Sequence, residues 1–325
     1  MPEFANFAIC SEHHPPYGGH PVLIPHPPGS YEYTFLSSAI YIAVSALMTP
    51  KGQDVLTQIA FDYDNCAQHG RLFHGSRRAA HRTVRLFTEK IMDRFPLLVI
   101  SSAASPTALG FHSREPWSGR WEEFDPRQQM VAISPRIVRN MISSADSPKQ
   151  FRLWIFQVAV VLMHEVGGHL MVTFLGHGHV ITPRIMTIAG FNSHVRPDNG
   201  ESGRILETWL LGGVAEFQSD RRLRDDHPGK LWLIAPGAHK IRRIPSSTVD
   251  EFVSRRFTFP LRTEGPAVHI TTRADFYAAT QHLPDPYYYP WLHGGGMPPG
   301  VFDGHRVRIS DLVRLPLSSF RPPRF

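Results

Sequence analysis

Cysteine is scarce in this sequence, which has only Cys10 and Cys66 among its 325 residues. Two cysteines cannot form a disulfide framework, and they cannot supply the thiolates of a cysteine-based zinc ribbon. A chain of this length buries a sizeable hydrophobic core, so it needs no cross-links to fold. The sequence therefore predicts an ordinary globular protein without a disulfide framework.

Long hydrophobic runs are also missing. The longest apolar stretches, Thr34–Met48 and Leu153–Met163, are shorter than the ~18–20 residues that a membrane span needs. The N-terminal region has no basic start followed by an apolar run, so we expect no secretory signal. These absences predict a soluble, cytoplasmic protein with no membrane partner.

Positive charge is present but not concentrated. The net charge is +6, and the 34 Lys and Arg residues are spread along the chain, with short basic pairs at Arg221-Arg222, Arg242-Arg243 and Arg255-Arg256. No interleaved aromatic and basic motif of a nucleic-acid reader accompanies these pairs. A solvated basic face explains them, so we expect no nucleic-acid partner.

Proline crowds both ends of the chain. Residues 1–30 contain seven prolines, three glycines and four histidines without an apolar period, so we interpret them as an extended N-terminal arm. Residues 31–225 are expected to form the main domain. Residues 226–325, which include the aromatic, glycine-rich stretch Tyr287–Gly296, are expected to form a loop-rich subdomain packed on it.

The main domain is expected to be rich in helices. Apolar residues three and four positions apart predict helices between Tyr31 and Leu98, and Pro96–Ser101 and Gln129–Ile133 look like short strands. Ser134-Pro135 and Ser147-Pro148 each combine a capping serine with a proline suited to the first helical turn. Both dipeptides therefore predict the start of a helix.

The helix that starts at Ser147-Pro148 carries the candidate site. Its apolar residues occupy more than one side, which is typical of a buried helix. The run His164-Glu165-Val166-Gly167-Gly168-His169 then places polar groups inside a core, which is costly unless they are paired or bound to metal. Two hydrogen-bonded core histidines are the structural alternative to a metal site.

The spacing of the two histidines has a geometric consequence. Zinc sites commonly use histidines four residues apart on a helix, with a glutamate after the first as general base. Four residues leave the side chains roughly 40° apart, whereas the five between His164 and His169 leave them roughly 140° apart. A π-type turn would restore convergence, and Gly167 and Gly168 lie where it is needed. We therefore predict a wide turn in this segment.

Two motifs resemble those of known metallopeptidases. His164-Glu165-x-x-Gly168-His169 resembles the longer zinc motif of the dipeptidyl peptidase III family, a gluzincin variant. Glu201-Ser-Gly-x-x-x-Glu207 resembles the run around the glutamate ligand of thermolysin-like enzymes, in which the second glutamate binds zinc. The block from His164 to Asp220 is also similar to fungal proteins of unassigned activity with the same order of motifs.

This resemblance implies an α+β, zincin-like fold that is helix-rich, with a small sheet and a buried active-site helix. It implies a zinc ion held by His164, His169 and Glu207, with Glu165 as general base. The strand at Gln129–Ile133 would lie near the helix, where an edge strand can hold an extended peptide. Leu211 departs from the pattern, because thermolysin-like enzymes carry an acidic residue there to orient a ligand histidine.

Three other glutamates are alternatives for the third ligand, and one of them is Glu165, which could bind the metal instead of acting as base. A helix is expected from about Asn199 to Asp220, with Glu207 near its middle among apolar residues. Glu216 is the second choice, because with Asp220 it repeats a Glu-x-x-x-Asp pattern of the gluzincin kind. Glu201 is expected to point elsewhere, either as a first-turn carboxylate or as a partner of Arg204.

Two further histidines follow the expected end of the active-site helix at Gly176. They are His177 and His179, and we expect them in an exposed loop.

The expected function is zinc-dependent hydrolysis of an amide or peptide bond in a peptide or small-molecule substrate. Zinc would activate water, and Glu165 would take the proton and pass it to the leaving amine. One alternative is a non-peptidase metalloenzyme of small-molecule metabolism that uses zinc or non-haem Fe2+, since two histidines and a carboxylate also suit iron. The other is a metal-binding, non-catalytic protein on a zincin-like scaffold.

Overall fold

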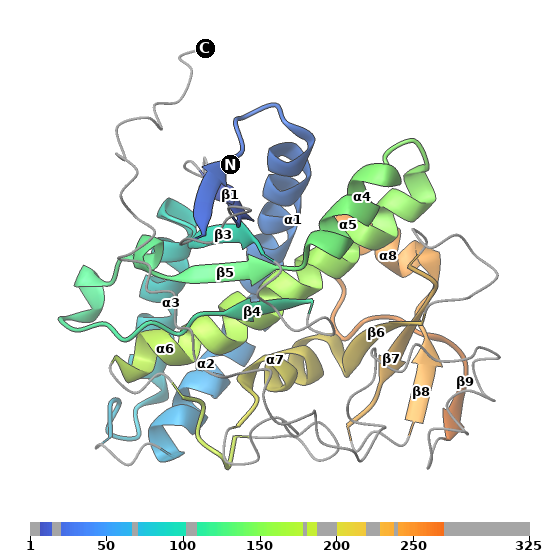
Figure 1. The fold of residues 1–325 in the computed structure, drawn as a ribbon. Helices are drawn as coiled ribbons and strands as arrows, with labels where there is room; N and C mark the ends of the chain where they lie inside the picture. The colour runs from blue at the N-terminus through green and yellow to red at the C-terminus, as the bar shows by residue number, and fades with distance from the viewer. Residues whose placement is uncertain are drawn as a thin grey trace, which may run out of the picture.

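The computed structural model describes residues 7–14, 21–66, 71–101, 109–177, 181–186, 200–218, 228–236 and 240–269. Helices and two small sheets make up this part of the chain, which confirms the predicted α+β class. Figure 1 shows helices packed along one side of the larger sheet, and the smaller sheet beside them. His179 and the stretch Tyr287–Gly296 lie outside the described residues.

The larger sheet has the strand order β2-β1-β3-β5-β4. β3 (Leu97–Ile100) and β5 (Met130–Ile133) confirm the two predicted strands and pair in parallel. β4 (Gly110–His112) runs antiparallel to β5 and forms the edge of the sheet. The edge strand beside the helix that carries His164 and His169 is therefore β4, whereas the sequence suggested the strand Gln129–Ile133. A three-residue strand is too short to leave a periodic pattern.

Residues expected in an extended N-terminal arm instead join this sheet. β1 (Ile9–His13) pairs in parallel with β3, and β2 (Val22–Pro25) pairs antiparallel with β1. Ile9 and Leu23 are buried, so each strand gains hydrophobic contacts as well as backbone hydrogen bonds. Strands this short cannot be recognised by an apolar period among prolines and histidines.

The predicted helical region resolves into three helices. They are α1 (Tyr31–Leu47), α2 (Pro50–Cys66) and α3 (Arg77–Asp93). Ser30 begins α1 by accepting a hydrogen bond from the backbone N–H of Tyr33, as an N-cap serine does. The buried faces of all three helices belong to one hydrophobic core.

Both serine-proline pairs mark the start of a helix, as predicted. α4 (Pro135–Ser143) begins after Ser134, whose hydroxyl accepts from the N–H of Arg136. α5 (Pro148–Met163) begins after Ser147, although the side chain of that serine makes no capping hydrogen bond. α5 continues without a break through His164–Leu170 into α6 (Met171–Gly176).

This continuous helix is long and apolar enough to cross a membrane. It spans 29 residues, Pro148–Gly176, but 94% of its most apolar window is buried inside the protein. A mostly buried helix of this kind is typical of the core of a soluble protein. The apolar run read from the sequence was shorter, because it stopped at the polar residues His164 and Glu165.

The smaller sheet has the order β6-β7-β8-β9 and follows α7 (Ser202–Leu211). Its strands are β6 (Val214–Gln218), β7 (Lys230–Ile234), β8 (Lys240–Arg243) and β9 (Glu264–His269), and α8 (Ser246–Val253) lies between β8 and β9. β6 pairs with β7, so the sheet crosses the domain boundary expected at residue 225.

The helix predicted to run to Asp220 ends earlier. Gly212 adopts a left-handed conformation with φ of 89°, and its N–H bonds to the carbonyl of Thr208, which closes α7. Glu216, expected on a helix, therefore lies on strand β6.

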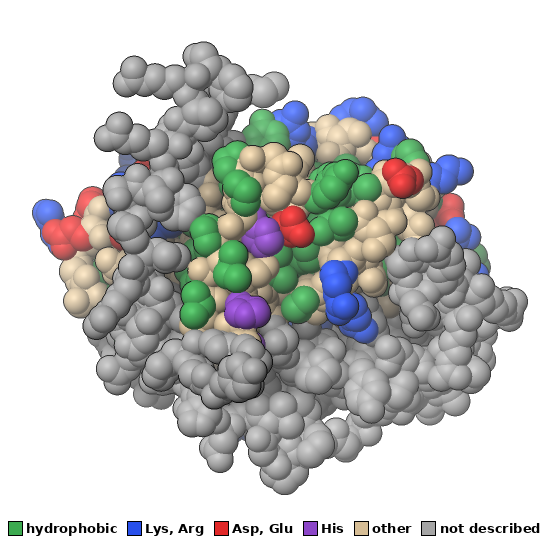
Figure 2. All heavy atoms as spheres, turned by 45° about the horizontal axis from the view of Figure 1, so that its top comes forward, with side chains coloured by type: hydrophobic (Ala, Val, Ile, Leu, Met, Phe, Trp, Pro, Cys, Tyr) green, Lys and Arg blue, Asp and Glu red, His purple; other side chains and the backbone are tan. Residues whose placement is uncertain are grey.

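Described Lys and Arg side chains do not gather into one patch on the face drawn in Figure 2, where they lie among acidic and hydrophobic side chains. The basic pairs Arg242-Arg243 and Arg255-Arg256 are exposed, as expected for solvated side chains.

Candidate metal centre

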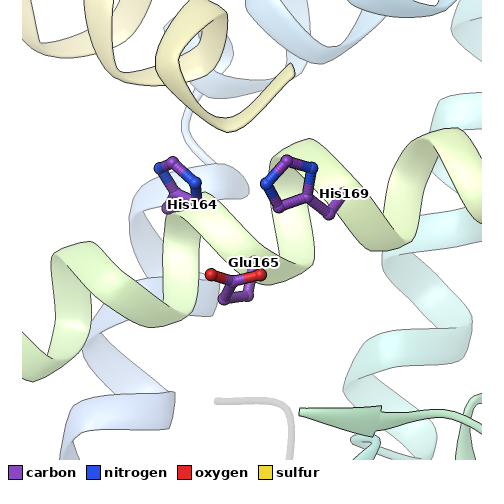
Figure 3. Close-up of side chains that lie close together, drawn as sticks. All are labelled: His164, Glu165 and His169. Carbon is purple, nitrogen blue, oxygen red and sulfur yellow. The ribbon is translucent and has the colours of Figure 1, made fainter. Parts of the chain in front are cut away.

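The segment His164–Leu170 is a π-helix, which confirms the predicted wide turn. The imidazole rings of His164 and His169 lie with centroids 4.9 Å apart and planes inclined by 72°. Figure 3 shows both rings on the same side of the helix, with Glu165 at the turn between them. Five-residue spacing therefore brings the two histidines together, as a regular α-helix would not.

The two glycines of the turn allow close packing by other helices. A Cβ atom on Gly168 would lie 2.4 Å from the Cα atom of Gly203 in α7. A Cβ atom on Gly167 would lie 2.8 Å from side-chain atoms of both Leu47 and Leu206. Neither glycine has a positive φ. The two glycines thus let α1 and α7 approach the π turn closely, and they do not supply an unusual backbone conformation.

Gly203 fits against the first histidine in the same way. A Cβ atom at this position would lie 2.3 Å from Nε2 of His164. Real Cβ atoms do not approach so closely, so a side chain here would displace the imidazole. The glycine of the Glu-Ser-Gly run therefore makes room for the first turn of α7 beside the histidines.

Glu201 contacts both imidazoles. Its Oε1 atom lies 3.4 Å from Nε2 of His164 and 3.0 Å from Nε2 of His169. The same oxygen is buried, and it has no partner with hydrogen-bond geometry among the described residues. Glu201 immediately precedes α7 and has non-helical backbone angles. The direction of its side chain therefore cannot be predicted by counting helical turns back from Glu207. One carboxylate oxygen thus faces the Nε2 atoms of both histidines.

Glu207 contacts the other nitrogen of the first histidine. Its Oε1 atom lies 2.6 Å from Nδ1 of His164, so Nδ1–H donates to the carboxylate. A carboxylate on the far nitrogen fixes the orientation of an imidazole and directs Nε2 toward a ligand. The carboxylate facing both Nε2 atoms is therefore that of Glu201, which differs from the order Glu207, Glu216, Glu201 expected from the sequence.

Glu216 belongs to a buried charge cluster behind the histidines. Arg204 lies 3.3 Å from Glu207 Oε1 and 3.4 Å from Glu216 Oε1. The sequence suggested Glu216 as the second-choice ligand on a helix, but this residue is buried on strand β6. Its link to His164 runs through Arg204 and Glu207, so Glu216 supports the cluster rather than facing the imidazoles.

Glu165 lies within reach of the two imidazoles. One ligand atom from each of His164, Glu165 and His169 can be chosen so that all lie within 4.8 Å of one another. Glu165 is buried, and its Oε2 atom has no hydrogen-bond partner among the described residues. The edge strand passes beside it, because a Cβ atom on Gly110 would lie 3.6 Å from Glu165 Cγ. A carboxylate in this position can accept a proton from a group held near the imidazoles.

Arg114, Thr182 and Ser202 surround the second histidine. Arg114 Nη2 contacts Nδ1 of His169, and Ser202 Oγ lies 3.2 Å from the same nitrogen. Thr182 Oγ1 accepts from Arg114 Nη1 at 3.2 Å and lies 3.0 Å from Ser202 Oγ. Sequence reasoning missed this group, because its members come from three separate segments without a shared motif.

Burial and charge act in opposite directions on the titrating groups. Burial disfavours protonation of His164, but the carboxylates of Glu201 and Glu207 outweigh it and raise the pKa of His164 to about 10. Burial lowers the pKa of His169, and the positive charge of Arg114 lowers it further. Burial would raise the pKa of Glu201, but the two imidazoles hold it well below its usual range.

The histidine that follows the helix lies outside this cluster. His177 stacks on Trp117 with ring centroids 4.1 Å apart, and its Nε2 lies 3.1 Å from the carbonyl oxygen of Gly119. It was expected in an exposed loop, and its described contacts instead anchor the end of α6.

Comparisons with protein-family models, with curated proteins and with solved structures find no match.

Proposed function

We propose that this chain is a metal-dependent hydrolase that binds one zinc ion through His164, His169 and Glu201. The observation that carries the proposal is the position of Glu201 Oε1, 3.4 Å and 3.0 Å from the two Nε2 atoms. Two ligand atoms of a tetrahedral zinc, each ~2.0–2.2 Å from the metal, are about 3.4 Å apart. Each of the two nitrogen–oxygen distances is thus compatible with a pair of ligands on one ion.

The surrounding polar atoms support a metal at this point. Glu201 Oε1 and Glu165 Oε2 are buried without a hydrogen-bond partner among the described residues. Buried carboxylate oxygens that lack partners are costly, and a cation between them removes that cost. Glu207 would then orient His164 through Nδ1. Thermolysin-like enzymes use an acidic residue for this at the position of Leu211, so Glu207 would take over that role here.

The chemistry proposed is hydrolysis of an amide or peptide bond, as in the gluzincin peptidases that the two motifs resemble. Bound zinc lowers the pKa of a water molecule and polarises a carbonyl. Glu165, next to the imidazoles, would accept the proton of that water and deliver it to the leaving amine. The antiparallel edge strand β4 beside Glu165 suits an extended peptide. We propose a soluble, cytoplasmic setting, with peptides as the first substrate class to test.

Metal content tests the proposal most directly. Purified wild-type protein is expected to contain about one zinc per chain, and His164→Ala and His169→Ala are each expected to lose it. His81→Ala, at an exposed histidine of α3, is the matched control and should retain the metal. If both site variants keep stoichiometric metal, the proposed site is wrong. Iron with dioxygen consumption would favour the non-peptidase alternative, and zinc without hydrolysis the non-catalytic one.

A further inference from the structure

The two histidines of the proposed metal site differ in what faces their Nδ1 atoms. Nδ1 of His164 faces a carboxylate oxygen of Glu207, which can only accept a hydrogen bond when ionised. Nδ1 of His169 faces the guanidinium of Arg114, which can only donate. Nδ1 must therefore carry a proton in His164 and a lone pair in His169.

A donor on Nδ1 determines where the proton of His169 lies. Because Arg114 donates to Nδ1, that nitrogen presents its lone pair, and the proton of a neutral imidazole is then on Nε2. Nε2 in turn lies 3.0 Å from the negatively charged Oε1 atom of Glu201, whose charge favours a proton on the nitrogen that faces it, although the pair does not have hydrogen-bond geometry. The described arrangement thus stabilises the tautomer of His169 whose Nε2 has no lone pair for a metal.

Metal binding has different consequences for the two rings. If the Nε2 proton of His164 leaves, a neutral imidazole remains, with its Nδ1–H on Glu207. If the Nε2 proton of His169 leaves while Arg114 stays in place, an imidazolate remains. Neutral imidazole is the usual metal ligand, so His169 must gain a proton on Nδ1 as it loses the one on Nε2. The imidazole keeps one proton in total, and solvent exchanges both.

We propose that Arg114 is a positioning residue that locks His169 in the tautomer unable to bind metal through Nε2, and that it must release His169 before the metal site forms. This inference rests on the proposed function, because it assumes that His169 is a ligand. Once Arg114 has left, Ser202 Oγ, 3.2 Å from Nδ1, can accept the new Nδ1–H. Ser202 therefore favours the metal-binding tautomer, and Arg114 opposes it.

The surroundings of Arg114 suit such a lock. Thr182 Oγ1 accepts from the second terminal nitrogen of the guanidinium and also contacts Ser202 Oγ, so the three side chains share one network around Nδ1. The backbone of Arg114 is left-handed, with φ of 54°, two residues beyond the edge strand β4. Such strain in a residue other than glycine persists only where its surroundings impose it, and it is common at switch regions.

Zinc affinity should respond in opposite directions to the loss of the two partners of Nδ1. Arg114→Met removes the donor, so zinc should bind about tenfold to a hundredfold more tightly than to wild type. Ser202→Ala removes the acceptor, so zinc should bind more weakly by a similar factor. Arg120→Met, at an exposed arginine paired with Glu123, controls for the loss of one positive charge. Competition with a chelator at one fixed pH measures the zinc affinity of wild type and of the three variants.

The tautomer of metal-free wild-type protein gives a second readout that no merely structural role would move. Nitrogen-15 NMR of the histidine rings, with the His169 signals assigned through His169→Ala, should show the proton on Nε2. Arg114→Met should move the proton toward Nδ1. The lock is wrong if metal-free wild type carries the proton on Nδ1, or if Arg114→Met binds zinc no more tightly than wild type.

Failure of the lock and failure of the proposed function give different results. If wild type binds zinc through His164 and His169 but Arg114→Met is no tighter, only the lock fails. If neither wild type nor Arg114→Met binds zinc, the proposed function fails and the lock has no metal site to control. If only Arg114→Met binds zinc, the lock is supported in its strongest form.

Discussion

Glu207 Oε1 lies 2.6 Å from Nδ1 of His164, on the nitrogen that faces away from Glu201. One imidazole is thereby held between two carboxylates of the same chain segment. In a metal site of this form, the carboxylate that faces Nε2 would bind the ion, and the carboxylate that faces Nδ1 would orient the ring. The pair Glu201 and Glu207 therefore invites comparison by matched substitutions.

Glu201→Gln and Glu207→Gln should weaken zinc binding to different extents. Glutamine at 207 still offers an oxygen to Nδ1–H, so the affinity should fall by about tenfold to a hundredfold, as for other residues that orient a ligand. Glutamine at 201 removes the negative charge nearest both Nε2 atoms, so the loss should be larger still. Chelator competition on both variants measures the ranking. A larger loss in Glu207→Gln would return the ligand role to Glu207.

Glu165→Gln should keep zinc but lose most hydrolysis. The amide fills the same space beside β4 but cannot take a proton from water, and a general base contributes about 10²–10⁴-fold to the rate. Mass spectrometry of a panel of unmodified peptides, at equal zinc content, provides the measurement. Glu123→Gln, at an exposed carboxylate, is the control and should cleave like wild type. Cleavage by Glu165→Gln at the wild-type rate would leave Glu165 a structural role.

Glu216→Gln should change how stability depends on pH. Burial, followed by the carboxylate of Glu207, raises the pKa of Glu216 from 4.5 to about 7 against the opposing charge of Arg204. Between these values the unfolded chain releases the proton while the folded chain keeps it. The free energy of unfolding of wild type therefore falls as pH rises from 4.5 to 7, by an amount on the order of 3 kcal/mol.

Urea unfolding of metal-free protein at several pH values would measure this effect. The free energy of unfolding of Glu216→Gln should rise relative to wild type between pH 4.5 and 7 and then stay level. Glu89→Gln, at an exposed carboxylate of α3, is the control for loss of one negative charge. A difference that is constant across this range would contradict the burial of a titrating Glu216.

Local patterns predicted the features that local geometry controls. Serine followed by proline marked the starts of α4 and α5, because the fixed φ of proline acts within the first turn of both helices, and Ser134 also caps α4. The five-residue spacing of His164 and His169 required a π turn for convergence, and the turn is present. The expected site residues His164, Glu165 and His169 do lie together.

The remaining features depend on contacts between distant segments. Glu201 turns toward the histidines because α7 begins one residue later and meets the π turn at Gly203, which no pattern around Glu201 reveals. Arg114 reaches His169 from the end of β4, a strand too short to predict. The glycines at 212 and 213 could have signalled the end of α7, since two glycines in a helix interior are unfavourable.

The π turn absorbs one residue without changing the phase of the helix that follows it. Deleting Gly167 would return the two histidines to the four-residue spacing of a regular helix, in which the side chains also lie on nearly the same side. Phe174, which lies 5.2 Å from Phe87 and 5.1 Å from Phe124 between ring centroids, would then keep its place in its aromatic cluster. A change between the two spacings is therefore compatible with unchanged packing at the far end of the helix.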